Sequence, residues 1–112
     1  MRSLSTHALD AVSGEPAAGL GVRLSRRTQD TQDWVELAAT TTDADGRVKD
    51  LAPDGLESGV HRLVFDTAAY FTAANLPGFY PEVTVAFTVT EERHYHVPLL
   101  LSPFAFSTYR GS

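Results

Sequence analysis

The sequence predicts an all-β domain, built as a two-sheet sandwich or a small barrel with one short helix. Segments in which apolar and polar residues alternate recur along the chain between turn residues, as they do in half-buried strands. The clearest of these segments are rich in β-branched and aromatic residues. A single alanine-rich segment departs from the alternation. No repeat or linker is evident, so we expect residues 1–112 to form one domain.

Five predicted strands lie in the first part of the chain, separated by turns that contain glycine, proline or aspartate. They cover residues 4–9, 22–25, 34–42, 47–49 and 60–65. The strand over 22–25 illustrates the pattern, because its apolar and polar side chains point to opposite faces. Strands of this kind predict a sheet that covers a core on one side.

The alanine-rich segment over residues 66–74 is predicted to be a helix. It begins with Asp66 and Thr67, which suit a helix N-cap, and continues with strong helix formers. Asn75 and Pro77 end it. We therefore expect one short helix packed beside the sheets.

Three further strands, over residues 83–89, 94–101 and 104–110, bring the predicted number to eight. In the strand over 94–101 the side chains expected to face the core are Tyr95, Val97, Leu99 and Leu101. Those expected to project the other way are His94, His96, Pro98 and Leu100. An outer face that mixes apolar and ionisable groups predicts a subunit interface lined by a polar site.

The composition excludes several classes of function. The chain has 14 acidic and 9 basic residues and a net charge of -5, which disfavours nucleic acid or an anionic membrane as a partner. It has no cysteine, which excludes a disulfide framework and a thiolate metal site. No apolar run is long enough to span a membrane, and the N-terminus lacks a secretory signal. We therefore expect a cytoplasmic protein, or a periplasmic one if a signal peptide has been removed.

The polar residues near the C-terminus are the first candidates for a functional site. Tyr109, Arg110, Gly111 and Ser112 place an aromatic ring, a cation and a hydroxyl next to apolar packing residues. His96 is the leading candidate for a catalytic group, because an imidazole can accept and return a proton near neutral pH. Together these residues predict a site formed in part by the C-terminal segment itself.

Three other histidines and one arginine allow more than one interpretation. His94 shares a face with His96 but lies closer to a turn, which predicts exposure to solvent. His61 lies in a strand without a polar neighbour, which favours a structural role, and His7 is interpreted as a surface or edge residue. Arg47 is either a solvated strand residue or a group that binds a planar, carbonyl-rich ligand and keeps a nearby imidazole neutral.

No motif predicts a metal ion or an organic cofactor. His94 and His96 could supply two zinc ligands, with His7 as a speculative third, but two ligands are too few. Asp43-x-Asp45-Gly46 lacks the remaining oxygen ligands of a calcium loop, so it is interpreted as a turn.

Several motifs, taken together, resemble those of the transthyretin-like 5-hydroxyisourate hydrolases. They are LSTHALD at residues 4–10, GEPA at 14–17, DGR at 45–47, FYPEV at 79–83, HYHVPLLLSP at 94–103 and YRGS at 109–112. They occur in the family's order over nearly the whole chain, and YRGS is the signature that separates these enzymes from the hormone carrier transthyretin. One departure is Ala105-Phe106, where the family commonly has Gly-Tyr. By alternation Phe106 points away from the face of Tyr109, so we expect this change to alter packing rather than chemistry.

The resemblance implies a transthyretin-like two-sheet β-sandwich and a homotetramer whose central channel holds the active sites. It implies hydrolysis of 5-hydroxyisourate to 2-oxo-4-hydroxy-4-carboxy-5-ureidoimidazoline in urate degradation, without a metal or organic cofactor. The residues that match the family's site are His7, Arg47, His96, Tyr109, Arg110, Gly111 and Ser112. In this scheme His7 or His96 is the general base, and Arg47 stabilises the oxyanion. The alternative is a transthyretin-type carrier that binds a hormone-like ligand in the same channel without catalysis.

Overall fold

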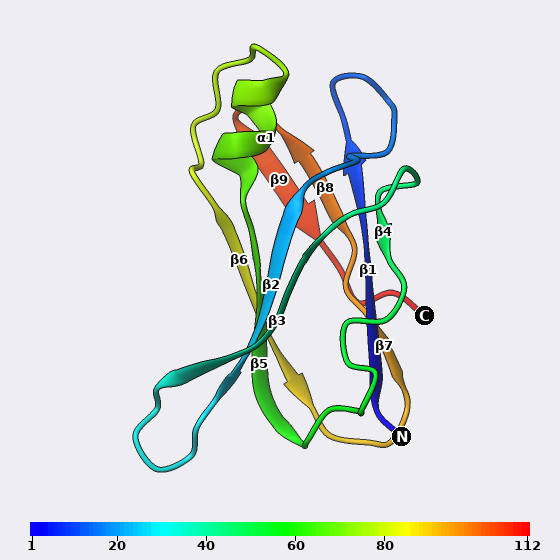
Figure 1. Cartoon of the computed structure of the whole chain (residues 1–112), viewed down its shortest axis with the longest axis vertical. Helices are drawn as coiled ribbons and strands as arrows, with labels where there is room; N and C mark the ends of the chain where they lie inside the picture. The colour runs from blue at the N-terminus through cyan, green and yellow to red at the C-terminus, as the bar shows by residue number, and fades with distance from the viewer.

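Two β-sheets face each other in the computed structural model, which describes all residues from Met1 to Ser112 (Figure 1). The first sheet contains β1 (Ser3–Asp10), β4 (Arg47–Val48), β7 (His94–His96), β8 (Leu99–Ser102) and β9 (Ala105–Thr108). The second contains β2 (Gly21–Arg27), β3 (Trp34–Thr41), β5 (Gly59–Phe65) and β6 (Val83–Val89). The prediction of a two-sheet β-sandwich is confirmed.

The strand order brings the two ends of the chain together. The first sheet runs β4-β1-β8-β9, with β7 also paired to β1, and the second runs β3-β2-β5-β6. Every pairing is antiparallel except those of β1 with β7 and β8, which are parallel. Both termini therefore lie near β1 and β7 (Figure 1).

The strand predicted over residues 94–101 is interrupted, so the structure has nine strands instead of eight. Val97 and Pro98 lie between β7 and β8, and Pro98 has no N–H with which to continue the hydrogen-bond ladder. Pro98 is also buried, which corrects the expectation that it projects outward with His96. The four side chains predicted to face the core do so, because each is at most 8% exposed.

Alternation along β1 separates the core from an outer face. Its even-numbered residues, from Leu4 to Asp10, are buried between the sheets, whereas its odd-numbered residues are half-buried on the other side. The odd-numbered residues are Ser3, Ser5, His7 and Leu9. The outer face of the first sheet thus carries polar and titratable groups on a strand whose opposite face anchors the core.

The predicted short helix is α1 (Thr67–Ala73), and it lies at one end of the sandwich (Figure 1). The Asp66 carboxylate caps it by accepting a hydrogen bond from the Ala69 N–H at 3.3 Å. The Tyr70 hydroxyl donates to the buried carboxylate of Asp10 at 2.7 Å, and burial together with this bond raises the pKa of Tyr70 to about 12. This contact ties the helix to the end of β1. No helix of the chain has the length and apolar character needed to cross a membrane.

His61 lies wholly inside the core, which agrees with the structural role predicted for it. Its ring stacks on Phe87 with centroids 6.1 Å apart, and its Nδ1–H donates to the Gly59 carbonyl at 3.3 Å. Its Nε2 is buried without a hydrogen-bond partner. Burial, the largest cause, lowers the pKa of His61 below its ordinary value, so the folded protein holds this imidazole neutral.

Replacing His61 with phenylalanine should reduce the acid sensitivity of the fold. As the pH falls below about 6.5, the unfolded chain protonates this histidine whereas the folded chain resists, so the free energy of unfolding decreases. The variant loses this contribution and retains the one from His96, whose pKa is also lowered. Urea unfolding at about pH 7.5 and about pH 5 measures the difference. Equal decreases in the two proteins would contradict the assignment.

Candidate active site

His7 and Arg47 meet on the outer face of the first sheet. They are directly opposite each other in the antiparallel pairing of β1 with β4. The His7 Nε2–H donates to the backbone carbonyl of Asp45 at 3.0 Å. Because a carbonyl can only accept, this bond places a proton on Nε2 and leaves Nδ1 of a neutral His7 open to a ligand.

The turn before Arg47 fixes the position of this pair. The Asp43 carboxylate accepts hydrogen bonds from the backbone N–H groups of Asp45 and Arg47, both at 2.9 Å, and the bond from Arg47 is the main cause that lowers the pKa of Asp43. Gly46 has φ +74°, and a Cβ there would collide with the carbonyl oxygen of Ala8. Asp43-x-Asp45-Gly46 is therefore a turn, as predicted.

His96 reaches the same face from β7. Ser5 on β1 lies opposite it in the parallel pairing, and Ser5 Oγ is 2.7 Å from His96 Nδ1. Nothing in the protein hydrogen-bonds to His96 Nε2, so this nitrogen is available to a ligand. Ser5 lies between the two histidines on this face. It pairs with His96 on β7, and it precedes His7 by two residues along β1.

The C-terminal segment passes directly over His96. The antiparallel register that pairs Leu99 with Thr108 continues to a bridge between His96 and Gly111, where the Gly111 N–H donates to the His96 carbonyl at 2.8 Å. A Cβ on Gly111 would lie 2.5 Å from His96 Cδ2. Only glycine fits here without displacing the imidazole.

The other residues of the terminal motif are placed less closely. Tyr109 and Arg110 line a cavity of about 350 Å³ between β6 and the C-terminal segment, a cavity that His96 also lines. Both side chains are exposed, and Ser112 is exposed beyond Gly111. The structure thus brings His7, Arg47, His96 and Gly111 together, with Tyr109 and Arg110 at the margin.

The charged groups that act on His96 are positive. Burial is the largest cause that lowers the pKa of His96, followed by the charges of Arg47, His94 and His7. The ion pairs of the protein lie elsewhere, so the Arg47 guanidinium has no carboxylate partner. A neutral imidazole beside an unpaired guanidinium can take a proton from water and bind an oxygen-rich, planar ligand.

Two serines and His94 extend the site in a way that the sequence did not predict. Ser3 Oγ is 2.6 Å from His94 Nδ1, and Ser5 Oγ is 2.7 Å from His94 Nε2. His94 is exposed, as expected, but both of its ring nitrogens are bonded. In the sequence, Ser3, Ser5 and His7 occupy alternate positions of one strand, which places all three on the same face. Their partners could not be predicted, because these depend on the pairing of distant segments.

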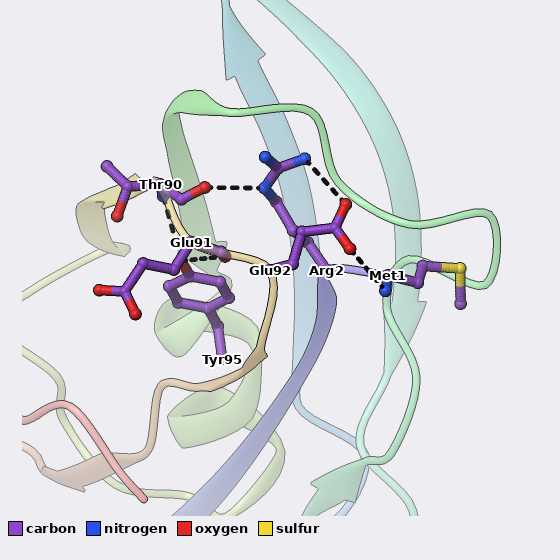
Figure 2. A network of polar contacts seen from close by, with 6 residues as sticks. All are labelled: Met1, Arg2, Thr90, Glu91, Glu92 and Tyr95. Atoms are coloured by element: carbon purple, nitrogen blue, oxygen red, sulfur yellow. Dashed lines mark hydrogen bonds and ion pairs between the residues drawn. The ribbon is translucent and has the colours of Figure 1, made fainter.

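A network at the start of β7 holds this part of the sheet in place (Figure 2). The Tyr95 hydroxyl accepts from the Thr90 N–H at 3.1 Å and donates to the Glu91 carbonyl at 2.8 Å. Arg2 Nε donates to the Thr90 carbonyl at 2.9 Å, and its guanidinium lies 3.9 Å from the Glu92 carboxylate. The turn that leads into His94 is thereby fixed to the beginning of β1.

The structure contains no group of three or more histidine, aspartate or glutamate side chains arranged to hold a metal ion. The two histidines of the His94-x-His96 pair face the same serine hydroxyl. They are therefore already hydrogen-bonded within the protein.

Comparison with known proteins identifies relatives along the whole chain. The model of the HIUase/transthyretin family matches residues 4–111. The 5-hydroxyisourate hydrolase of Mus musculus is 48% identical and aligns with 97% of this chain and 94% of its own length. The 5-hydroxyisourate hydrolase of Caulobacter vibrioides is 47% identical, with all of both chains covered.

Solved structures share the fold. The structure of Klebsiella pneumoniae 5-hydroxyisourate hydrolase superimposes with a TM-score of 0.89 at 36% identity, covering 100% of this chain and 94% of the other. Sea bream transthyretin in complex with thyroxine superimposes with a TM-score of 0.91 at 37% identity, covering 96% and 93%. The fold similarity alone therefore does not separate a hydrolase from a hormone carrier.

Replacing Gly111 with alanine should displace the His96 ring and reduce activity while the protein stays folded. The added methyl group collides with His96 Cδ2, and misplacement of a catalytic group by about 1 Å can reduce rates by about 100-fold. Circular dichroism checks the fold, and the change in activity is compared with that of Gly14→Ala. Gly14 has a positive φ, unlike Gly111, but a Cβ there meets open space and the residue lies in a turn away from His96, so that control should keep its activity. Equal activities in both variants would show that the close contact with His96 is unimportant.

Replacing Arg47 with glutamine should raise the pKa of His96. Loss of the guanidinium removes one of the positive charges that disfavour protonation of this ring. An NMR titration of the histidine ring protons measures the shift, and Arg23→Gln, on the exposed side of β2, is the matched control. An unchanged His96 titration in the Arg47 variant would mean that the two groups do not interact.

Proposed function

The chain belongs to the HIUase/transthyretin family, and we infer that it hydrolyses 5-hydroxyisourate in urate catabolism. The observation that carries this function is the neutral imidazole of His96 beside the unpaired guanidinium of Arg47. Hydrolysis of a cyclic amide needs both elements: a base for water and a positive group for the oxyanion. Their occurrence on one face of one sheet supports assigning the reaction to this site.

We propose that His96 is the general base and acts through Nε2. Water gives a proton to this nitrogen as its oxygen attacks a carbonyl carbon of the six-membered ring. The tetrahedral intermediate then collapses, the ring C–N bond breaks, and the proton on His96 passes to the departing nitrogen. The product, 2-oxo-4-hydroxy-4-carboxy-5-ureidoimidazoline, carries the new carboxylate. The lowered pKa of His96 favours this role, because a base must be unprotonated before the reaction begins.

Arg47 and His7 hold the substrate in this scheme. The planar guanidinium of Arg47 donates to the carbonyl oxygens and stabilises the negative charge that develops on one of them. His7, with Nε2–H donated to Asp45, accepts a ring N–H of the substrate at Nδ1. We assign Tyr109 and Ser112 to the wall of the pocket. The exposed Arg110 beside β6 is assigned to positioning the C-terminal segment instead.

We also propose that the protein is a homotetramer with its active sites at subunit interfaces. Leu9 and Leu100 lie opposite each other on the outer face and are only half-buried in the monomer. The strand β9 is at the edge of its sheet with all four residues exposed; Phe106 within it is 41% exposed, and Phe104 just before it is 66% exposed. An apolar face and an open strand edge on the same sheet provide two distinct surfaces for assembly.

A hormone carrier is the second candidate, because the fold matches the thyroxine complex of sea bream transthyretin as closely as it matches a hydrolase. The residues on the outer face argue against it. An apolar ligand gains little from two imidazoles and an unpaired guanidinium, which would lose water when the ligand binds. Thyroxine binding measured by calorimetry, without activity on 5-hydroxyisourate, would favour the carrier.

The activity is tested with 5-hydroxyisourate generated in place by urate oxidase, followed by loss of its ultraviolet absorbance. The protein should accelerate this loss far beyond the spontaneous rate. His96→Ala and Arg47→Ala should each reduce kcat/KM by about 100-fold or more, because each removes a base or an oxyanion donor. Arg23→Ala serves as the matched control. Wild-type protein that leaves the spontaneous rate unchanged would refute the function.

The role of the C-terminal segment is tested by deleting residues 109–112. The deletion removes Gly111 and its bond to the His96 carbonyl, so His96 loses its cover on one side. We expect a loss of activity comparable to that of His96→Ala, with the unfolding midpoint little changed. Full activity after the deletion would exclude any part for this segment in catalysis.

A further inference from the structure

Four side chains form a continuous hydrogen-bonded chain along the boundary between β1 and β7. Starting from the proposed base, His96 Nδ1 is 2.7 Å from Ser5 Oγ, which is 2.7 Å from His94 Nε2. His94 Nδ1 is in turn 2.6 Å from Ser3 Oγ. All three distances are those of good hydrogen bonds. The proposed mechanism uses only the first of the four groups.

Counting protons leaves three ways to satisfy this chain. The Ser5 hydroxyl has one proton and two lone pairs, so it either connects the two imidazoles in one of two directions or accepts from both of them and turns its proton to solvent. In the first arrangement, His96 Nδ1–H donates to Ser5, and Ser5 donates to His94 Nε2. In the second, His94 Nε2–H donates to Ser5, and Ser5 donates to His96 Nδ1. A neutral His96 then carries its proton on Nε2 in the second arrangement, and on Nδ1 both in the first and in the third, in which Ser5 accepts from both rings.

The arrangements differ in whether His96 can act as a base. The nitrogen that faces a ligand is Nε2, because Nδ1 is bonded to Ser5. Only the second arrangement lacks a lone pair there. His7 needs no such device, since its bond to the Asp45 carbonyl already determines its tautomer. The tautomer of His96 is thus determined by its partners Ser5 and His94.

We propose that Ser5 and His94 are positioning residues that hold neutral His96 in the Nδ1–H tautomer, with Nε2 open for proton abstraction. The inference rests on the proposed function for its catalytic meaning. The tautomer itself is a property of the free protein. Ser3 completes the chain by accepting from His94 Nδ1–H, and its own proton is free to bond water.

The backbone keeps these hydroxyls and rings in register. The Val97 N–H donates to the Ser5 carbonyl at 3.1 Å, and Thr6 Oγ1 donates to the Val97 carbonyl at 2.7 Å in the core. The Ser3 N–H donates to the Arg93 carbonyl at 3.3 Å. Together with the Arg2 and Tyr95 contacts to the preceding turn (Figure 2), these bonds fix both ends of the chain.

Protonation of His94 would end its role as an acceptor for Ser5. A protonated His94 donates from both nitrogens, so the Ser5 proton is released and can turn to His96 Nδ1. When it does, His96 Nε2 carries the proton and cannot act as a base. The other groups around the pair are His7 on β1, Arg47 on β4, and Glu92 and Arg93 in the turn before β7.

The tautomer is tested first by NMR on protein labelled with ¹⁵N-histidine, at a pH where the histidines are neutral. Long-range proton–nitrogen correlations distinguish a protonated ring nitrogen from an unprotonated one. In the wild type we expect His96 to be protonated on Nδ1. Ser5→Ala should increase the fraction with the proton on Nε2, whereas Ser5→Thr, which keeps the hydroxyl, should resemble the wild type.

Kinetics with 5-hydroxyisourate test the consequence. Loss of an orienting partner of a functional histidine typically costs about 10- to 100-fold, so we expect Ser5→Ala to reduce kcat by that range and change KM little. His94→Phe should have the same effect, and the double variant should be no worse than either single one. His94→Gln, whose amide oxygen can accept from Ser5, should restore part of the loss. Ser13→Ala, beyond the opposite end of β1, is the control.

Two results would overturn the proposal. One is a wild-type His96 with its proton on Nε2; the other is a Ser5→Ala variant with wild-type kcat. Both can be separated from failure of the function itself. If wild-type protein did not accelerate hydrolysis, the function would fail while the NMR measurement still tested the tautomer.

Discussion

The parallel pairing of β1 with β7 and β8 determines which side chains can meet in this protein. It places Ser3 opposite His94 and Ser5 opposite His96, although about ninety positions separate the partners in the chain. The core-facing residues of the same strands, such as Leu4 and Tyr95, make this pairing stable, because a slip of one residue would expose them to water. The polar chain on the outer face is therefore held in register by apolar burial on the inner face.

Alternation in the sequence predicted the faces that Tyr95 and His96 occupy, because the period of a strand is local information. It correctly assigned Tyr95 to the core and His96 to the outer face. It could not predict the partner of Ser5, because the pairing of distant strands leaves no trace in local periodicity. Pro98 shows a second limit, since a break in the ladder changed the burial that simple alternation predicts.

The fold by itself leaves the chemistry open, because a hydrolase and a thyroxine complex of transthyretin both superimpose on it closely. The difference must come from side chains on one exposed face. Here that face has the Arg47 guanidinium, which forms no ion pair, beside the imidazoles, and the bond from His7 to Asp45 uses a backbone carbonyl. A carboxylate beside Arg47 would satisfy the guanidinium and raise the pKa of His96. Its absence keeps the arginine available and the imidazole neutral.

The length of the C-terminal segment follows from the same register. The pairing of β8 with β9 places Leu99 opposite Thr108, and its continuation past Pro98 places His96 opposite Gly111. Inserting or removing one residue in this segment would shift the register by one position and bring Arg110 or Ser112 opposite His96. Either side chain would have to occupy the space in which a single added carbon already lies 2.5 Å from the imidazole. The close contact between the backbone and the His96 ring therefore requires both a glycine at this position and a fixed number of residues between it and β9.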